Sequence, residues 1–217
     1  MQNLGENLLR YNLDKNKFFT WDCETEGLNL KRSKPWEISW SIYHGEKLVE
    51  EHQHFLKWPN LKVSIGAAKA TGFNPENINK FGEDPKKIID LFDKYIYNKE
   101  YKIIGANILG YDIYIHNLSR NLLGYKTDYS YLDRIYDTNI LSKIWKLGLK
   151  IPENKEDFLE FQFKVGSIIQ KGLKTNNALM AEEFGMKIEE EKKHQAAYDI
   201  KMTWFVFINL IKKLEIQ

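Results

Sequence analysis

The spacing of apolar and polar positions near the N-terminus predicts three β-strands. The runs 18–23, 37–43 and 47–56 carry aromatic and aliphatic residues with the spacing of half-buried strands. The residues His44-Gly45-Glu46 lie between the second run and the third and predict a hairpin turn. We therefore expect the sheet to begin with antiparallel strands.

The rest of the chain follows mainly helical spacing. Asp84-Pro85 is a suitable N-cap and first-turn pair for a helix with the apolar face Ile88, Ile89, Phe92, Tyr95 and Ile96. A strand at 102–105 follows, and a helical crossover implies that this strand pairs in parallel. Further helices are expected at 111–123, 139–147 and 196–214, and the stretch 146–155, which contains Gly148 and Pro152, is the clearest loop.

These elements predict the α/β class, with a mixed sheet of about five strands flanked by helices. The chain shows no repeat, low-complexity tract or domain boundary, so we expect a single domain over residues 1–217 with a core at about 18–211. Four of the six tryptophans are assigned to this core, whereas Trp58 and Trp145 are left undecided; the four are Trp21, Trp36, Trp40 and Trp204.

Composition narrows the possible environments and partners. A chain of 217 residues with 43% hydrophobic and 29% charged residues is long enough to bury a sizeable core. The net charge of +2 is too small to indicate nucleic-acid binding, so any basic path for phosphates must be local. One cysteine excludes an internal disulfide, and no run of about 18 apolar residues is present. We expect a cytoplasmic protein with no secretory leader and no membrane partner.

The first polar feature with chemical meaning is the pair Asp22 and Glu24, at the end of the first apolar run. Alternate residues of a strand point to the same side, so these carboxylates form a pair while Cys23 faces the core. Taken alone, an Asp-x-Glu pair is also common among solvated acids on an edge strand.

Two further polar pairs follow in the sequence. Asn107 and Asp112 lie between a short strand and a helix, and His194 and Asp199 lie where a charged stretch meets the last helix. Each pair has an ordinary explanation, because acids are favoured in the first turn of a helix and histidines among charges are commonly solvated. Four acids gathered at one end of a sheet, however, are costly unless a cation neutralises them. The three segments together predict a site for a divalent metal.

The motifs Asp22-x-Glu24-Thr25-x-Gly27-Leu28, Asn107 to Asp112 and His194-x-Ala196-x-x-Asp199, in this order, resemble the three exonuclease motifs of the DEDD superfamily. A histidine five residues before the last aspartate is typical of the histidine subclass (DEDDh, DnaQ-like), whereas the sibling subclass has tyrosine where this chain has Gln195. The resemblance spans roughly 18–211. Two departures are Thr71, where many members have histidine, and the segment 107–112, which is one residue longer than the commonest spacing.

The resemblance implies a ribonuclease H-like fold and a metal-dependent 3′-5′ exonuclease that releases nucleoside monophosphates from single-stranded DNA or RNA 3′ ends, as in proofreading or repair. It implies two Mg²⁺ or Mn²⁺ ions per site, with Asp22 bridging both, Glu24 and Asp199 completing one shell, and Asp112 holding the other ion. It assigns the general base to His194. The expected substrate contacts are Thr25, Gly27, Leu28, Phe73 and Asn107.

Several alternatives remain open from the sequence. An RNA-trimming enzyme of the oligoribonuclease type uses the same chemistry, and a catalytically silent nucleic-acid-binding relative keeps the same fold. A polymerase or another replication or repair protein is a possible partner. Lys143, Lys146 and Lys150 suit a phosphate track, although a solvated helix face is the favoured interpretation.

Overall fold

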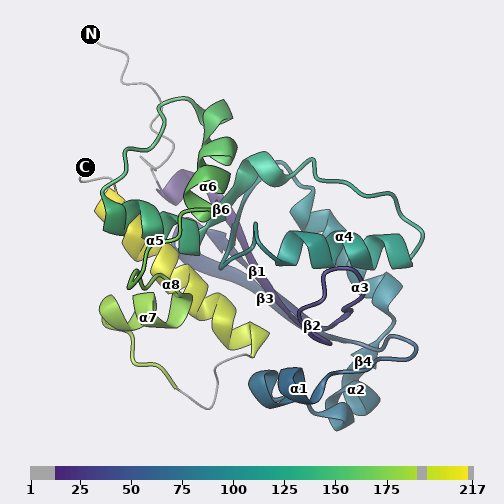
Figure 1. Cartoon of the computed structure of the whole chain (residues 1–217). Helices are drawn as coiled ribbons and strands as arrows, with labels where there is room; N and C mark the ends of the chain where they lie inside the picture. The colour runs from purple at the N-terminus through teal and green to yellow at the C-terminus, as the bar shows by residue number, and fades with distance from the viewer. Residues whose placement is uncertain (1–12, 190–194, 215–217) are drawn as a thin grey trace.

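The computed structural model describes residues 13–189 and 195–214, and these residues contain a six-stranded sheet with the order β4-β3-β2-β1-β5-β6 (Figure 1). The strands are β1 Lys17–Thr25, β2 Pro35–His44, β3 Lys47–Leu56, β4 Gly82–Glu83, β5 Tyr101–Gly105 and β6 Ile135–Asp137. As predicted, β1, β2 and β3 are antiparallel, and β5 is parallel to β1. The predicted mixed sheet of about five strands is confirmed, and the sixth strand, β4, has only two residues and leaves no pattern in the sequence.

The helices are α1 Ile65–Thr71, α2 Pro75–Phe81, α3 Pro85–Ile96, α4 Asp112–Leu122, α5 Thr138–Leu147, α6 Phe158–Gly166, α7 Asn177–Glu183 and α8 Ala196–Leu214. Short 3-10 helices occur at Leu13–Lys15, Leu132–Arg134 and Lys155–Asp157. The Asp84 side chain caps α3 by accepting the Lys86 N–H at 2.8 Å, as the sequence predicts. The predicted loop 146–155 is irregular only from Gly148 to Asn154, since α5 continues to Leu147.

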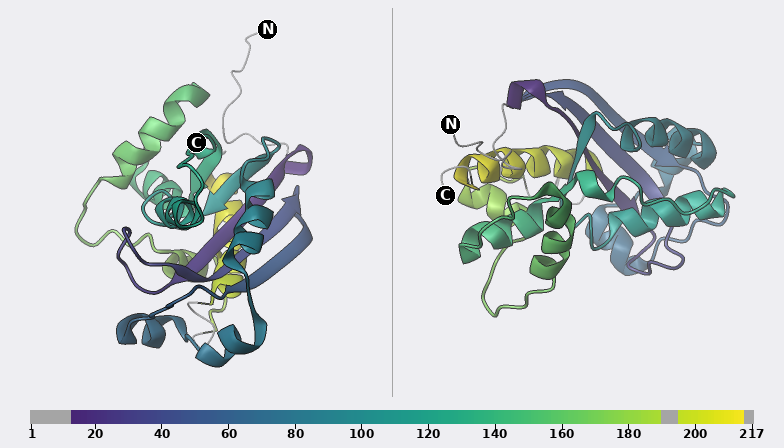
Figure 2. Two further views of the ribbon diagram at one scale, coloured as in Figure 1. Left: turned by 90° about the vertical axis from the view of Figure 1, so that its right-hand side faces the viewer. Right: turned by 90° about the horizontal axis from the view of Figure 1, so that it is seen from above.

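Helices cover both faces of the sheet, with α8 on one face and α3 on the other (Figure 2). Aromatic contacts identify the residues on each face. Phe18 of β1 packs against Trp204 of α8, with ring centroids 5.2 Å apart, whereas Trp21 packs against Phe92 of α3 at 4.9 Å. Because side chains alternate along a strand, the even-numbered residues of β1, including Asp22, face α8.

The buried core is strongly aromatic. Trp21, Trp36, Trp40 and Trp58 are buried, and Trp204 is partly buried and stacks on Tyr43 with ring centroids 3.8 Å apart. In the described part of the chain, no helix has the length and apolarity needed to cross a membrane.

The strand register brings several strand ends to one edge of the sheet. Thr20 of β1 lies opposite Ile104 of β5, and Gly105 of β5 lies opposite Asp137 of β6. These three strands are parallel, so their carboxyl ends point the same way. The segments that leave this edge carry the candidate site.

Candidate metal centre

Three of the four predicted acids meet at this edge of the sheet. Asp22 and Glu24 come from β1, and Asp199 comes from the first turn of α8, which crosses the face of the sheet. Each residue offers a carboxylate oxygen, and these oxygens all lie within 4.8 Å of one another. The even-numbered side chains of β1 point to the face that α8 covers. The cluster therefore forms where the start of α8 lies over Asp22 and Glu24.

Asp112 lies beside the cluster without belonging to it. It is the first residue of α4, it is buried, and its Oδ1 accepts a hydrogen bond of 3.2 Å from the Cys23 thiol. Cys23 is therefore a core residue, as predicted, and also a partner of Asp112, a contact that no pattern in the sequence indicates. The charge of Asp112 nevertheless acts on Asp22 and Glu24.

The electrostatics of the metal-free cluster favour protonated carboxyls. Burial, followed by the neighbouring charges, raises the pKa of Asp22 well above its usual value and that of Glu24 to about 9. Burial also raises the pKa of Asp112 to about 7, although the Cys23 thiol opposes the shift. A bound divalent cation would replace these protons, and carboxylate oxygens are the ligands that Mg²⁺ and Mn²⁺ prefer. The residues present therefore fit a hard divalent metal.

Asp137 supports the loop that leads to Asp112. Its buried carboxylate accepts the backbone N–H groups of Asn107 at 3.0 Å and Leu109 at 3.1 Å, and it caps α5 through Asn139 at 2.9 Å. Burial raises the pKa of Asp137 to about 6. No role was predicted for this residue from the sequence, although its place at the end of a strand and before a helix is a recognisable capping position.

Two glycines, Gly105 and Gly110, lie in or next to the same loop. A Cβ on Gly105 would lie 2.6 Å from the Ile108 Cβ, and a Cβ on Gly110 would lie 2.6 Å from the Asn107 side-chain oxygen. Asn107 itself is exposed and has a left-handed backbone with φ of 59°. The turn needs glycine at Gly105, where the Ile108 Cβ is fixed to the backbone, whereas at Gly110 the near atom is the movable end of the exposed Asn107 side chain.

The expected substrate residues lie at two separate places. The Thr25 hydroxyl bonds to the Tyr111 hydroxyl at 2.7 Å, and Tyr111 donates to the Gly27 carbonyl at 2.7 Å, which fixes the loop after β1. In this loop the Leu28 side chain is 89% exposed. Phe73 lies between α1 and α2 and packs on a buried tryptophan, Trp36, with ring centroids 5.0 Å apart.

Two clefts contain residues of the cluster or of the loop after β1. One, of about 600 Å³, is bordered by Asp22 and Asp199 and by residues of α7 and α8. The other, of about 540 Å³, lies behind the loop after β1 and is lined by Gly27, Leu28 and a basic group consisting of Arg32, Lys34 and Lys62. Phe73 lines neither of them. The second cleft also contains Glu26, which pairs with Lys34 at 3.5 Å, so its exposed cations that are unpaired within the described part of the chain include Arg32 and Lys62.

The predicted lysine stretch has another role. Lys143 donates to the Gly166 carbonyl at 2.7 Å and so ties α5 to the end of α6, and Lys146 pairs with Glu183 at 2.6 Å. The expectation of a solvated face is wrong for these two residues, because both side chains bridge helices. Lys150 is exposed and pairs with nearby Glu153.

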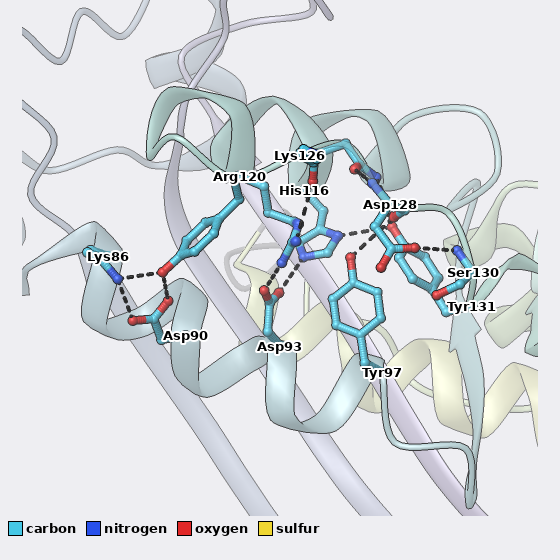
Figure 3. Close-up of polar contacts among 12 residues, drawn as sticks. Lys86, Asp90, Asp93, Tyr97, His116, Arg120, Lys126, Asp128, Ser130 and Tyr131 are labelled. Atoms are coloured by element: carbon cyan, nitrogen blue, oxygen red, sulfur yellow. Dashed lines mark hydrogen bonds and ion pairs between the residues drawn. The ribbon is translucent and has the colours of Figure 1, made fainter.

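A polar network between α3 and α4 holds the helix that begins at Asp112 (Figure 3). Asp93 of α3 bonds to His116 Nε2 at 2.8 Å and pairs with Arg120, while His116 Nδ1 bonds to the Tyr131 hydroxyl at 3.0 Å. Burial lowers the pKa of His116, so this side chain is neutral at pH 7. The network is structural, and it lies away from the carboxylate cluster.

His194, the predicted general base, lies outside the described residues, as do residues 190–193 before it. The structure therefore describes the third motif from Gln195 to Asp199.

Comparison with known proteins identifies the fold. No protein-family model and no curated protein matches the sequence. Among solved structures, the zinc-bound complex of E. coli exonuclease I with single-stranded DNA matches with a TM-score of 0.72 and 15% identity over 94% of this chain. E. coli exonuclease I with a dA16 oligonucleotide matches with a TM-score of 0.69 and 17% identity over 91% of this chain. A product-bound structure of exonuclease I matches with a TM-score of 0.67 and 15% identity over 93% of this chain.

This chain covers 42%, 41% and 46% of those three exonuclease I chains, less than half of each. The likeness confirms the ribonuclease H-like fold expected from the sequence and supports the resemblance to DnaQ-like exonucleases at the level of fold.

Proposed function

We propose that this chain is a metal-dependent 3′-5′ exonuclease of the DEDDh, DnaQ-like type that acts on single-stranded ends. The observation that carries the proposal is the cluster of Asp22, Glu24 and Asp199 within 4.8 Å, on the fold of exonuclease I. The structures with this fold include complexes of exonuclease I with single-stranded DNA. We therefore take single-stranded DNA as the first substrate to test and RNA as the second.

The acids supply the metal site. Asp22, Glu24 and Asp199 would hold one Mg²⁺ or Mn²⁺ ion, and Asp112 would contribute to a second ion next to Asp22. When bound, two such ions stabilise the charge that develops on the attacking and leaving oxygens of a phosphodiester. The protein's part is to hold the four carboxyls close together, and they would be deprotonated when the metal is bound.

The other residues handle the proton and the substrate. His194 would accept the proton of the attacking water, because an imidazole with a pKa near 6.5 is neutral at pH 7 and able to take it. The terminal nucleotide would lie against the loop from Thr25 to Leu28, with the exposed Leu28 side chain against the base. Phosphates farther along the strand would contact the exposed residues Arg32 and Lys62 of the basic cleft.

The test uses oligonucleotides that carry a label at the 5′ end. With Mg²⁺ or Mn²⁺, single strands should shorten stepwise, whereas a blocked 3′ end should prevent degradation and a blunt duplex should be degraded more slowly. EDTA and Asp22→Ala should each abolish the reaction. Cutting of a circular single strand at a comparable rate would contradict an exonuclease, and faster hydrolysis of RNA than of DNA would favour the exoribonuclease alternative.

A further inference from the structure

Glu37 is a buried carboxylate beside the metal centre that no motif accounts for. Its side chain is 3% exposed. It lies on β2 directly opposite Glu24 of β1 in the antiparallel register. Directly opposed residues of such a pair point to the same face, so Glu37 and Glu24 both point to the face covered by α8.

The polar neighbours of Glu37 lie on the sheet and at the start of α8. Its Oε1 accepts from Gln53 Nε2 of β3 at 2.9 Å and from the Ser39 hydroxyl of β2 at 3.4 Å. Burial raises the pKa of Glu37, and the nearby backbone N–H of Ala197, in the first turn of α8, is among the donors that oppose this shift. The first N–H groups of a helix have no partner within the helix, so an acceptor held by the sheet fixes where the helix begins.

Ala197 precedes Asp199 by two residues, a rise of about 3 Å along the helix. The position of this first turn therefore decides whether Asp199 reaches the two carboxylates of β1. We infer that Glu37 is a positioning residue: its buried carboxylate, opposite Glu24 and next to Ala197, holds the first turn of α8 and so places Asp199 within metal-binding distance of Asp22 and Glu24. This inference rests on the proposed metal centre.

The negative charge of Glu37 does not help the metal centre. A negative charge at Glu37 adds to the repulsion among Asp22, Glu24 and Asp199, and it makes Glu24 harder to ionise. Glu37 is therefore useful to the site for its oxygen acceptors. Glutamine can replace it by turning its oxygen toward the Ala197 N–H and its NH₂ toward Gln53, whose own amide can turn to accept.

The experiment compares Glu37→Ala, which removes the acceptor, with Glu37→Gln, which keeps an acceptor and removes the charge. Mn²⁺ affinity is measured by electron paramagnetic resonance of the free ion, and kcat is measured on a single-stranded oligonucleotide. We expect Glu37→Ala to weaken Mn²⁺ binding and to lower kcat, each by about 10–100-fold. Glu37→Gln should stay within a few-fold of the wild type in both. Should the Ala variant fail to fold, Glu37→Asp, which shortens the reach to Ala197, is expected to weaken Mn²⁺ binding in the same way.

The control is Glu51→Gln. Glu51 is another carboxylate that joins the sheet to α8, through an exposed ion pair of 3.2 Å with Lys201, and its change should leave Mn²⁺ affinity and kcat at wild-type values. A Glu37→Ala protein that only melts earlier, with unchanged Mn²⁺ affinity and kcat, would overturn the positioning role. Equal defects in Glu37→Ala and Glu37→Gln would overturn it as well, by assigning the effect to charge. If the wild type binds Mn²⁺ but hydrolyses nothing, the proposed function fails and the Mn²⁺ comparison still tests Glu37.

Discussion

Raising the pH of the metal-free protein from 7 to 9 should destabilise it, because a carboxyl of the candidate site releases its proton only at the upper end of this range. The carboxyl is that of Glu24, whose pKa is raised from 4.5 to about 9, first by burial and then by neighbouring charges. Between these values the folded protein binds a proton that the unfolded chain has released. Stability therefore falls as the pH rises.

The magnitude follows from this single group. One proton of difference changes the free energy of unfolding by about 1.4 kcal/mol per pH unit, and the slope halves as the pH reaches the folded pKa. Glu24 alone therefore contributes a loss of about 2 kcal/mol between pH 7 and 9, and Asp22, whose pKa is raised well above its usual value, adds a loss of the same sign. The window avoids His116, whose lowered pKa costs stability only where the unfolded imidazole takes up a proton, below about pH 7. Asp112, with a pKa of about 7, adds a smaller loss of the same sign at the lower end.

The assay is urea denaturation in EDTA at pH 7, 8 and 9. The wild type should lose at least about 2 kcal/mol, and Glu24→Gln should reduce that loss by about 2 kcal/mol. Glu76→Gln, at an exposed site on α2, is the matched control and should keep the wild-type slope. Saturating Mg²⁺ should remove or reverse the slope, because metal binding requires deprotonated ligands. A wild-type stability that is constant or increases from pH 7 to 9 in EDTA would refute the reasoning.

Three further predictions concern the proposed general base, the carboxylate of Asp137 and the basic cleft. His194→Ala should lower kcat by about 10²–10⁴-fold and leave Mn²⁺ affinity unchanged. The control is His44→Ala, at an exposed residue, which should not change kcat. Near wild-type turnover of His194→Ala would exclude His194 as the general base. Asp137→Ala leaves at least three backbone N–H groups without their acceptor, and at about 1–3 kcal/mol for each buried donor it should cost roughly 3 kcal/mol or more in urea denaturation. A loss below about 1 kcal/mol would show that water replaces the carboxylate. The double variant Arg32→Ala, Lys62→Ala should raise KM for a single strand and leave kcat unchanged. The slope of log affinity against log salt concentration should decrease in magnitude by about 0.7 for each phosphate that the protein no longer neutralises. An unchanged slope would show that the substrate does not contact the basic cleft.

Periodicity over a few residues made much of the fold predictable from the sequence. The spacing in 18–23, 37–43 and 47–56 identified the antiparallel strands, and Asp84-Pro85 marked the start of α3. The last helix was predicted at 196–214, the same residues as α8. These features depend on contacts between residues close in sequence, such as caps, turns and apolar faces. The two-residue strand β4 lacks such a pattern, because it exists only through its pairing with β3.

Part of the candidate site was equally local. Alternation along β1 placed Asp22 and Glu24 on one side and Cys23 on the other before any tertiary contact was considered. Asp112 was expected in the first turn of a helix, and it is the first residue of α4. In each case the backbone geometry of one element determines the direction of the side chain.

The sequence by itself therefore determined the order of the elements, the two carboxylates on one side of β1 and the motif that suggests a metal centre. Only the tertiary structure decided that Asp199 of α8 lies within 4.8 Å of those carboxylates and that Asp112 faces the Cys23 thiol. It also decided that Glu37 lies opposite Glu24 and that Asp137 holds the loop at Asn107. These are contacts between residues 13 to 177 positions apart in the chain, which strand register and helix packing create, and such contacts leave no spacing in the sequence from which they can be read.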